Sequence, residues 1–84
     1  MKENMYMADS YDINVNELVH SMNATIDYCR THDVSGWSQL RLMRRDISAT
    51  NAVSYAQLMD IREWLICHDM TTCPLYGMVE AVFS

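Results

Sequence analysis

Three residue types that often act together in catalysis stand next to one another in the sequence, as Cys67, His68 and Asp69. In an active site, a nucleophile, a base and an orienting acid converge on one reacting atom. The surrounding residues have a helical pattern, in which neighbouring side chains point about 100° apart and therefore diverge. The chain also has only two glycines and no Gly-rich phosphate loop. We therefore predict that the protein is not an enzyme, and that it has no catalytic residues and no cofactor.

A zinc site is the second chemistry that the residue types suggest. Cys29 and His32 are three residues apart, so a helix could direct both toward one point. Cys67, His68 and Cys73 lie near the end of a later helical segment. Their spacing matches no closed zinc site, and Cys29 also fits an apolar helix stripe as a small hydrophobic residue. We predict no metal ligands, with zinc as an alternative that the sequence leaves open.

A group of arginines is the third candidate. Arg41, Arg44 and Arg45 are three of the six basic residues in a chain of net charge −5. Their helical spacing predicts one basic patch, either paired with internal acids such as Asp46 or binding an acidic partner surface or a phosphate. We predict partner binding by the three arginines. We do not expect nucleic acid as the partner, because three arginines are few against the net negative charge.

Large apolar residues are abundant for a chain of this size, with eight methionines, five tyrosines and two tryptophans. Such residues are enriched at the centres of protein interfaces. Tyr28 falls opposite the apolar stripe of its helix, and Trp64 falls on a flank, so we predict that both bind a partner protein. For self-association we predict four further residues: Met5, Tyr6, Met7 and Met59.

Composition excludes several classes of protein. A chain of 84 residues that is 50% hydrophobic and 20% charged has the material for one folded domain. Its three cysteines form no disulfide framework, and its first residues do not resemble a signal peptide. No uncharged apolar run approaches the roughly 18 residues of a membrane span. We therefore expect a cytoplasmic protein, in the host cytoplasm if a virus encodes it, without a membrane partner.

The elements that must position these residues are helices. Asn14 is placed as an N-cap, Glu17 as its capping-box partner, and Ile13 and Leu18 as a hydrophobic staple. The helix is expected to end near Thr31. Its apolar face comprises Val15, Leu18, Val19, Met22, Ile26 and Cys29.

The second helix is expected after a turn at residues 33–36. Ser35 is its predicted cap, and it runs from Trp37 to about Arg45. Residues 47–53 are small, polar or β-branched, and this composition favours a connection with at most a loose helical turn.

The third helix lies within Ser54–Met70 and has an apolar arc roughly 200° wide, about twice that of an ordinary surface helix. This arc has a central line and two flanks: Leu58, Ile61 and Leu65; Tyr55, Met59 and Ile66; and Trp64. We expect one flank to be left for a second chain. Residues 53–58 repeat the capping pattern of residues 13–18, and residues 68–70 repeat that of 32–34. Duplicated helix hairpins would explain the repeat, and so would chance.

The last helix begins near Pro74, with Thr71 or Thr72 as its predicted cap. Its apolar stripe comprises Leu75, Met78, Val79, Val82 and Phe83. The sequence thus predicts an all-α fold, a small four-helix domain of two helix hairpins over residues 13–84. Residues 1–12 show no period and are expected to form an irregular N-terminal tail, either frayed and flexible or an extended arm.

Together these observations predict a small acidic protein-binding module that works as a homodimer. We expect it to be an inhibitor or adaptor of a larger protein, of the kind that viruses and mobile elements encode. The alternative is a regulatory or structural protein associated with nucleic acid through the arginine patch. A DNA-reading role for the third helix is disfavoured because it exposes Asp60 and Glu63.

Overall fold

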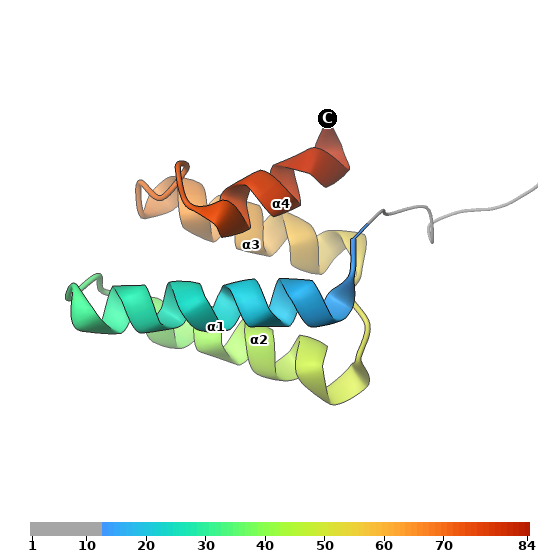
Figure 1. Cartoon of the computed structure of the whole chain (residues 1–84), viewed down its shortest axis with the longest axis horizontal. Helices are drawn as coiled ribbons and strands as arrows, with labels where there is room; N and C mark the ends of the chain where they lie inside the picture. Colours follow the sequence, from blue (N-terminus) through green and yellow to red (C-terminus); the bar gives the residue numbers. More distant parts are fainter. Residues whose placement is uncertain (1–12) are drawn as a thin grey trace, which may run out of the picture.

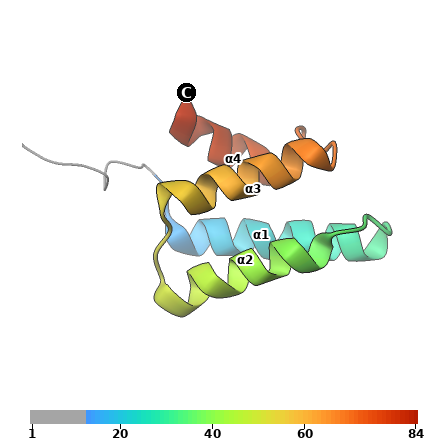
Figure 2. The same ribbon diagram turned by 180° about the vertical axis from the view of Figure 1, so that it is seen from behind.

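A computed structural model of the chain describes residues 13–84. This part holds four α-helices and no strand: α1 (Val15–Thr31), α2 (Trp37–Thr50), α3 (Tyr55–Cys67) and α4 (Pro74–Phe83). Consecutive helices run in opposite directions, so that α1 and α2 form one hairpin and α3 and α4 form another (Figure 1, and from behind in Figure 2). The predicted all-α fold of four helices is confirmed.

The starts of α1 and α3 are fixed by side-chain caps. The side-chain oxygen of Asn14 accepts a hydrogen bond of 3.1 Å from the backbone N–H of Glu17. Ser54 accepts the equivalent bond of 3.1 Å from Gln57, whose side chain in turn accepts the backbone N–H of Ser54 at 2.8 Å. Both predicted caps are confirmed, and each satisfies N–H groups that have no partner within the helix. The predicted return bond from the Glu17 side chain is not formed in the described chain, so the complete capping box occurs at α3 and not at α1.

The ends of α1 and α3 also share one local structure. Each helix ends in a histidine followed by an aspartate with positive φ, 59° at Asp33 and 58° at Asp69. The next residues, Val34 and Met70, donate backbone hydrogen bonds of 2.9 and 2.8 Å to carbonyls five residues earlier. This is a Schellman arrangement, which satisfies helix-end carbonyls. The repeat in the sequence therefore corresponds to a repeat of local structure.

All four helices contribute to one core. α1 packs on α2 and on α4, and α3 packs on α4 and on α2. Every apolar core side chain is at most 8% exposed: Leu18, Met22, Ile26, Cys29, Leu40, Ile47, Leu58, Ile61, Trp64, Leu65, Leu75 and Val79. The predicted stripes of the first and last helices supply six of these residues, because helical spacing alone determines which side chains share a face.

α2 is longer than predicted. The helix continues to Thr50, so the expectation of an end near Arg45 and of a connection beginning at residue 47 was wrong. Ile47 is fully buried, and the hydroxyl of Thr50 bonds back to the carbonyl of Asp46 at 3.2 Å. Burial of Ile47 outweighs the weak helix propensity of the small and polar residues around it.

In two helices the N-cap residue is not the one predicted, although α2 begins at Trp37 and α4 at Pro74 as expected. Gly36 rather than Ser35 precedes α2, and Cys73 rather than a threonine precedes α4; neither caps its helix through a side chain. Gly36 has a φ of +87°, a conformation that suits glycine far better than other residues. α4 begins with Pro74 as predicted, where the missing N–H has no cost.

Candidate functional site

The adjacent cysteine, histidine and aspartate form no catalytic arrangement in the described part of the chain. Cys67 is exposed, and no hydrogen bond links it to His68 or Asp69 within residues 13–84. The imidazole of His68 stacks on Trp64, with ring centroids 4.0 Å apart, and its Nδ1 lies 2.7 Å from the Trp64 carbonyl oxygen. A carbonyl only accepts, so Nδ1 carries the proton. His68 therefore completes the end of α3.

The cysteines and histidines considered as zinc ligands do not converge. Among residues 13–84, no three His, Cys, Asp or Glu side chains are placed to hold a metal ion. The buried thiol of Cys29 lies 3.5 Å from the sulfur of Met70, and the Cys73 thiol donates to the Met70 carbonyl at 3.3 Å. Burial, and to a smaller extent the charge of nearby Cys73, raises the pKa of the Cys29 thiol. Cys29 thus acts as a core residue.

The structure separates the three predicted arginines. Arg41 and Arg44 line a hollow of about 330 Å³ between α1 and α2, and Arg30 of α1 lines it with them. Arg45 does not line the hollow and instead lies 3.9 Å from the carboxylate of Asp46, both side chains being exposed. The single patch predicted from spacing is therefore two separate sites. Arg30 was missed because only the packing of α1 on α2 brings it close.

The two aromatic residues predicted to bind a partner differ in exposure. Tyr28 is 51% exposed, as expected, whereas Trp64 is 5% exposed and belongs to the core. The indole N–H of Trp64 donates a hydrogen bond of 3.1 Å to the carbonyl of Gly36. The prediction that Trp64 contacts a partner is contradicted, because its surface and its polar atom are already engaged within the chain.

The predicted self-association residues fall into two groups. Met59 is 44% exposed on α3, beside Tyr55 at 54% and Ile66 at 43%. Met59 and Ile66 thus form an exposed apolar stripe on this flank, next to Tyr55, whose ring packs edge-on against Phe83 of α4 with centroids 5.0 Å apart. The other predicted residues, Met5, Tyr6 and Met7, lie outside the described residues.

A large concave surface runs between α1 and α4. This α1–α4 groove has a volume of about 1000 Å³, and its lining is mostly apolar. One wall is formed by residues of α1: Asn16, Glu17, His20, Ser21, Ala24, Thr25 and Tyr28. The other wall is formed by the turn between α3 and α4 and by α4 itself: Asp69, Met70, Thr72, Cys73, Pro74 and Met78. The sequence predicted Tyr28 but not the groove, because its two walls come from segments that are far apart in the chain.

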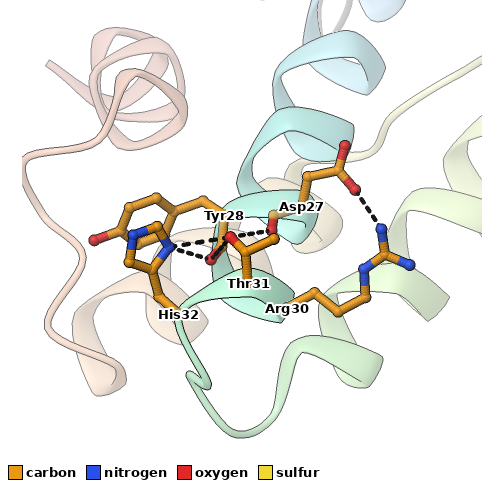
Figure 3. Close-up of polar contacts among 5 residues, drawn as sticks. All are labelled: Asp27, Tyr28, Arg30, Thr31 and His32. Atoms are coloured by element: carbon orange, nitrogen blue, oxygen red, sulfur yellow. Dashed lines mark hydrogen bonds and ion pairs between the residues drawn. The ribbon is translucent and has the colours of Figure 1, made fainter.

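Tyr28 is held in place on the wall of the groove. Its ring stacks on His32, with centroids 4.0 Å apart and planes at 17°, and Nδ1 of His32 lies 2.9 Å from the Tyr28 carbonyl oxygen. Figure 3 shows this pair on one side of α1 and the ion pair of Asp27 with Arg30 on the other. The α1–α4 groove and the hollow lined by Arg30, Arg41 and Arg44 therefore lie on opposite sides of α1.

The charges that line the groove are of one sign. Among residues 13–84, Glu17 and Asp69 are the charged side chains that line it, and no lysine or arginine of this part of the chain does so. The groove is therefore an apolar trough with an acidic rim.

The comparisons with known proteins found no match, neither to a protein family nor to a curated protein nor to a solved structure. Within residues 13–84, none of the helices has both the length and the apolar character that crossing a membrane requires.

Proposed function

We propose that the chain is a non-enzymatic protein-binding module, an inhibitor or adaptor that holds an amphipathic helix of its partner in the α1–α4 groove. The observation that carries this proposal is the groove itself, a long apolar surface left open beside a complete core. Binding an amphipathic helix in an apolar groove is a recurring mode of peptide recognition.

The dimensions of the groove suit a helix. Its wall on α1 extends from Asn16 to Tyr28, a distance of about 18 Å at 1.5 Å per residue. A helix of that length and of 10–12 Å diameter occupies roughly 1400–2000 Å³. A groove of about 1000 Å³ therefore accepts roughly half to seven tenths of such a helix, so that its apolar face is buried and its polar face stays in water.

The charges select between possible helices. Because Glu17 and Asp69 line the groove without a basic residue, a partner helix with lysines or arginines beside its apolar stripe is favoured. A second copy of this chain is a poor occupant, since it brings a net charge of −5 toward an acidic rim. We therefore assign the groove to a different, basic partner.

A synthetic peptide tests this assignment. The probe is an 18-residue amphipathic helix with leucines on one face and lysines beside it, bearing a fluorophore for anisotropy. Ala24→Trp fills the groove at an exposed α1 position and is expected to weaken binding at least about tenfold. Ala49→Trp, at an exposed α2 position outside the groove, is the matched control. A glutamate version of the peptide should bind less tightly, and equal binding by both tryptophan variants would refute the proposal.

We assign self-association to the exposed flank of α3 that is centred on Met59 and Ile66. Tyr55, Met59 and Ile66 share one side of this helix and are each at least 43% exposed. Two copies meeting through this stripe would form an isologous homodimer. Native mass spectrometry should show a dimer that Met59→Lys dissociates, whereas Leu42→Lys, at a 50% exposed leucine of α2, leaves it intact. A monomeric unmodified chain would overturn the dimer without bearing on the groove.

A further inference from the structure

Three arginines line one hollow, and their charges are not balanced by the acids beside them. Arg30, Arg41 and Arg44 line it, and Asp27 is the one acidic side chain from residues 13–84 that lines it with them. That carboxylate pairs with Arg30 at 3.1 Å. The lining therefore carries three positive charges and one negative charge, in a chain whose net charge is −5.

Two of the arginines have hydrogen-bonding capacity that the described chain does not use. The Nε atom of Arg44 is buried and has no hydrogen-bond partner. Arg41 forms no ion pair with any residue from 13 to 84. A buried donor without an acceptor costs free energy, and such a group in a folded protein calls for an explanation such as an absent ligand.

We propose that this hollow, defined by Arg30, Arg41 and Arg44, is a binding site for a phosphate group, either inorganic phosphate or a phosphate monoester. The planar guanidinium group matches the oxygens of phosphate, and arginines on two helices can contact it from two directions. The amide of Asn23 adds a polar group to the lining, and Trp37 and Ile26 add apolar surface for an organic substituent. At about 30 Å³ per water, the 330 Å³ hollow has room for about ten water-sized groups.

Nucleic acid fits this site less well than a single phosphate group. A nucleic-acid backbone is contacted by basic side chains distributed along a surface, each neutralising a separate phosphate. Here Arg45 lies outside the hollow beside Asp46, and Asp27 stands within it. The positive charge of Arg30, Arg41 and Arg44 is thus gathered around one hollow instead of being distributed along a surface.

Titration with inorganic phosphate, observed at the Nε–H groups of individual arginines, tests the proposal. The ¹⁵N-labelled protein is titrated at constant ionic strength, balanced with sodium chloride, and the arginine Nε–H resonances are followed. We expect a saturable shift of Arg44 and Arg41 and little change at Arg45. Arg41→Gln, at an exposed position, should weaken binding about tenfold, whereas the matched variant Arg45→Gln leaves it unchanged. Asp27→Asn should tighten binding, because it removes the only acid in the lining.

Further arms distinguish the sources of phosphate and guard against misfolding. Tighter binding of O-phosphoserine than of inorganic phosphate would assign the site to a monoester; the reverse would assign it to the free ion. The absence of a saturable shift at Arg44 overturns the proposal. It is also overturned if a duplex oligonucleotide binds more tightly than either phosphate and shifts Arg45 as much as Arg44. Circular dichroism melting of each variant confirms that it is folded, and Asp27→Asn provides a gain of binding that misfolding cannot produce.

Discussion

The indole N–H of Trp64 donates a hydrogen bond of 3.1 Å to the carbonyl of Gly36, and this bond joins α3 to the start of α2. His68 stacks on the other side of the indole and lies against Gly36. The junction between the two hairpins therefore depends on a tryptophan and a histidine at the end of α3 and on a glycine that lies 28 residues before the tryptophan. The N-cap position of α2 lies against His68 and has a positive φ, and glycine suits both conditions better than serine would.

Gly36→Ala should destabilise the protein. A Cβ at this position would lie 2.6 Å from Nε2 of His68, and the φ of +87° is unfavourable for alanine. We expect a loss of about 1–3 kcal/mol in the free energy of unfolding, measured with urea.

Gly77→Ala is the matched control for this substitution. A Cβ at Gly77 meets nothing within 4 Å, and alanine favours the helical conformation of α4. This variant should gain about 0.5–1 kcal/mol. Equal effects of the two substitutions would show that the Gly36 junction has no special role.

Glu80→Gln should show how stability depends on pH. Glu80 of α4 accepts a hydrogen bond of 2.7 Å from Nε of Arg62 of α3. This bond, with the charge of Arg62, lowers the pKa of Glu80 against the opposing effect of desolvation. A lowered pKa means that the stabilisation is present above the unfolded pKa of Glu80 and is lost as the pH falls through the folded one.

Thermal melting of wild type and Glu80→Gln across this pH range provides the measurement. The wild type should melt at the higher temperature at neutral pH, and the difference should vanish in acid. Asp60→Asn, at an exposed α3 acid with no ion pair among residues 13–84, should show no such convergence. A difference that persists below the folded pKa would contradict the role of the ion pair.

The parts of the fold that were predicted from the sequence are those determined by local interactions. Ser54 with Gln57, and Asn14 with Glu17, act within one helical turn, so residue types and spacing are sufficient to locate both helix starts. The end of α2 was placed too early because the helix continues through Ile47, whose burial outweighs the weak local propensity of its neighbours.

The candidate sites were less predictable for the same reason. The spacing of Arg41, Arg44 and Arg45 predicts a shared helical face, but which of them meets Arg30 depends on how α1 packs on α2. The α1–α4 groove depends on the path of the turn before Pro74, which no residue near Tyr28 encodes. Pairwise packing of helices thus decides both sites.

Alkylation should rank the three cysteines by exposure and pKa. Cys67 is exposed, Cys73 is half-buried, and Cys29 is fully buried with a pKa raised by burial. The thiolate is the reactive form, so Cys29 should react last. Pulses of iodoacetamide followed by peptide mass spectrometry measure the order, and in urea the three rates should converge. Labelling of native Cys29 as fast as Cys67 would contradict its burial.

Two aromatic–histidine pairs share one local geometry but have different surroundings. Tyr28 stacks on His32 at the end of α1, as Trp64 stacks on His68 at the end of α3, both with ring centroids 4.0 Å apart. The Trp64 pair is covered by Gly36 and the core, whereas Tyr28 remains 51% exposed on the groove wall. The same local motif thus joins the hairpins at one end and leaves a surface open at the other.

Substitution of the two aromatic residues should separate these roles. Trp64→Phe removes the hydrogen bond to Gly36 and part of a buried ring, and should lower the free energy of unfolding by about 1–3 kcal/mol. Tyr28→Ala changes an exposed residue to a better helix former and should alter stability by less than about 0.5 kcal/mol. It should nevertheless weaken binding of the lysine-rich amphipathic peptide, because Tyr28 supplies apolar area to the groove. If Tyr28→Ala destabilises the fold as much as Trp64→Phe and leaves peptide binding unchanged, the exposed pair is a structural cap and the groove does not use it.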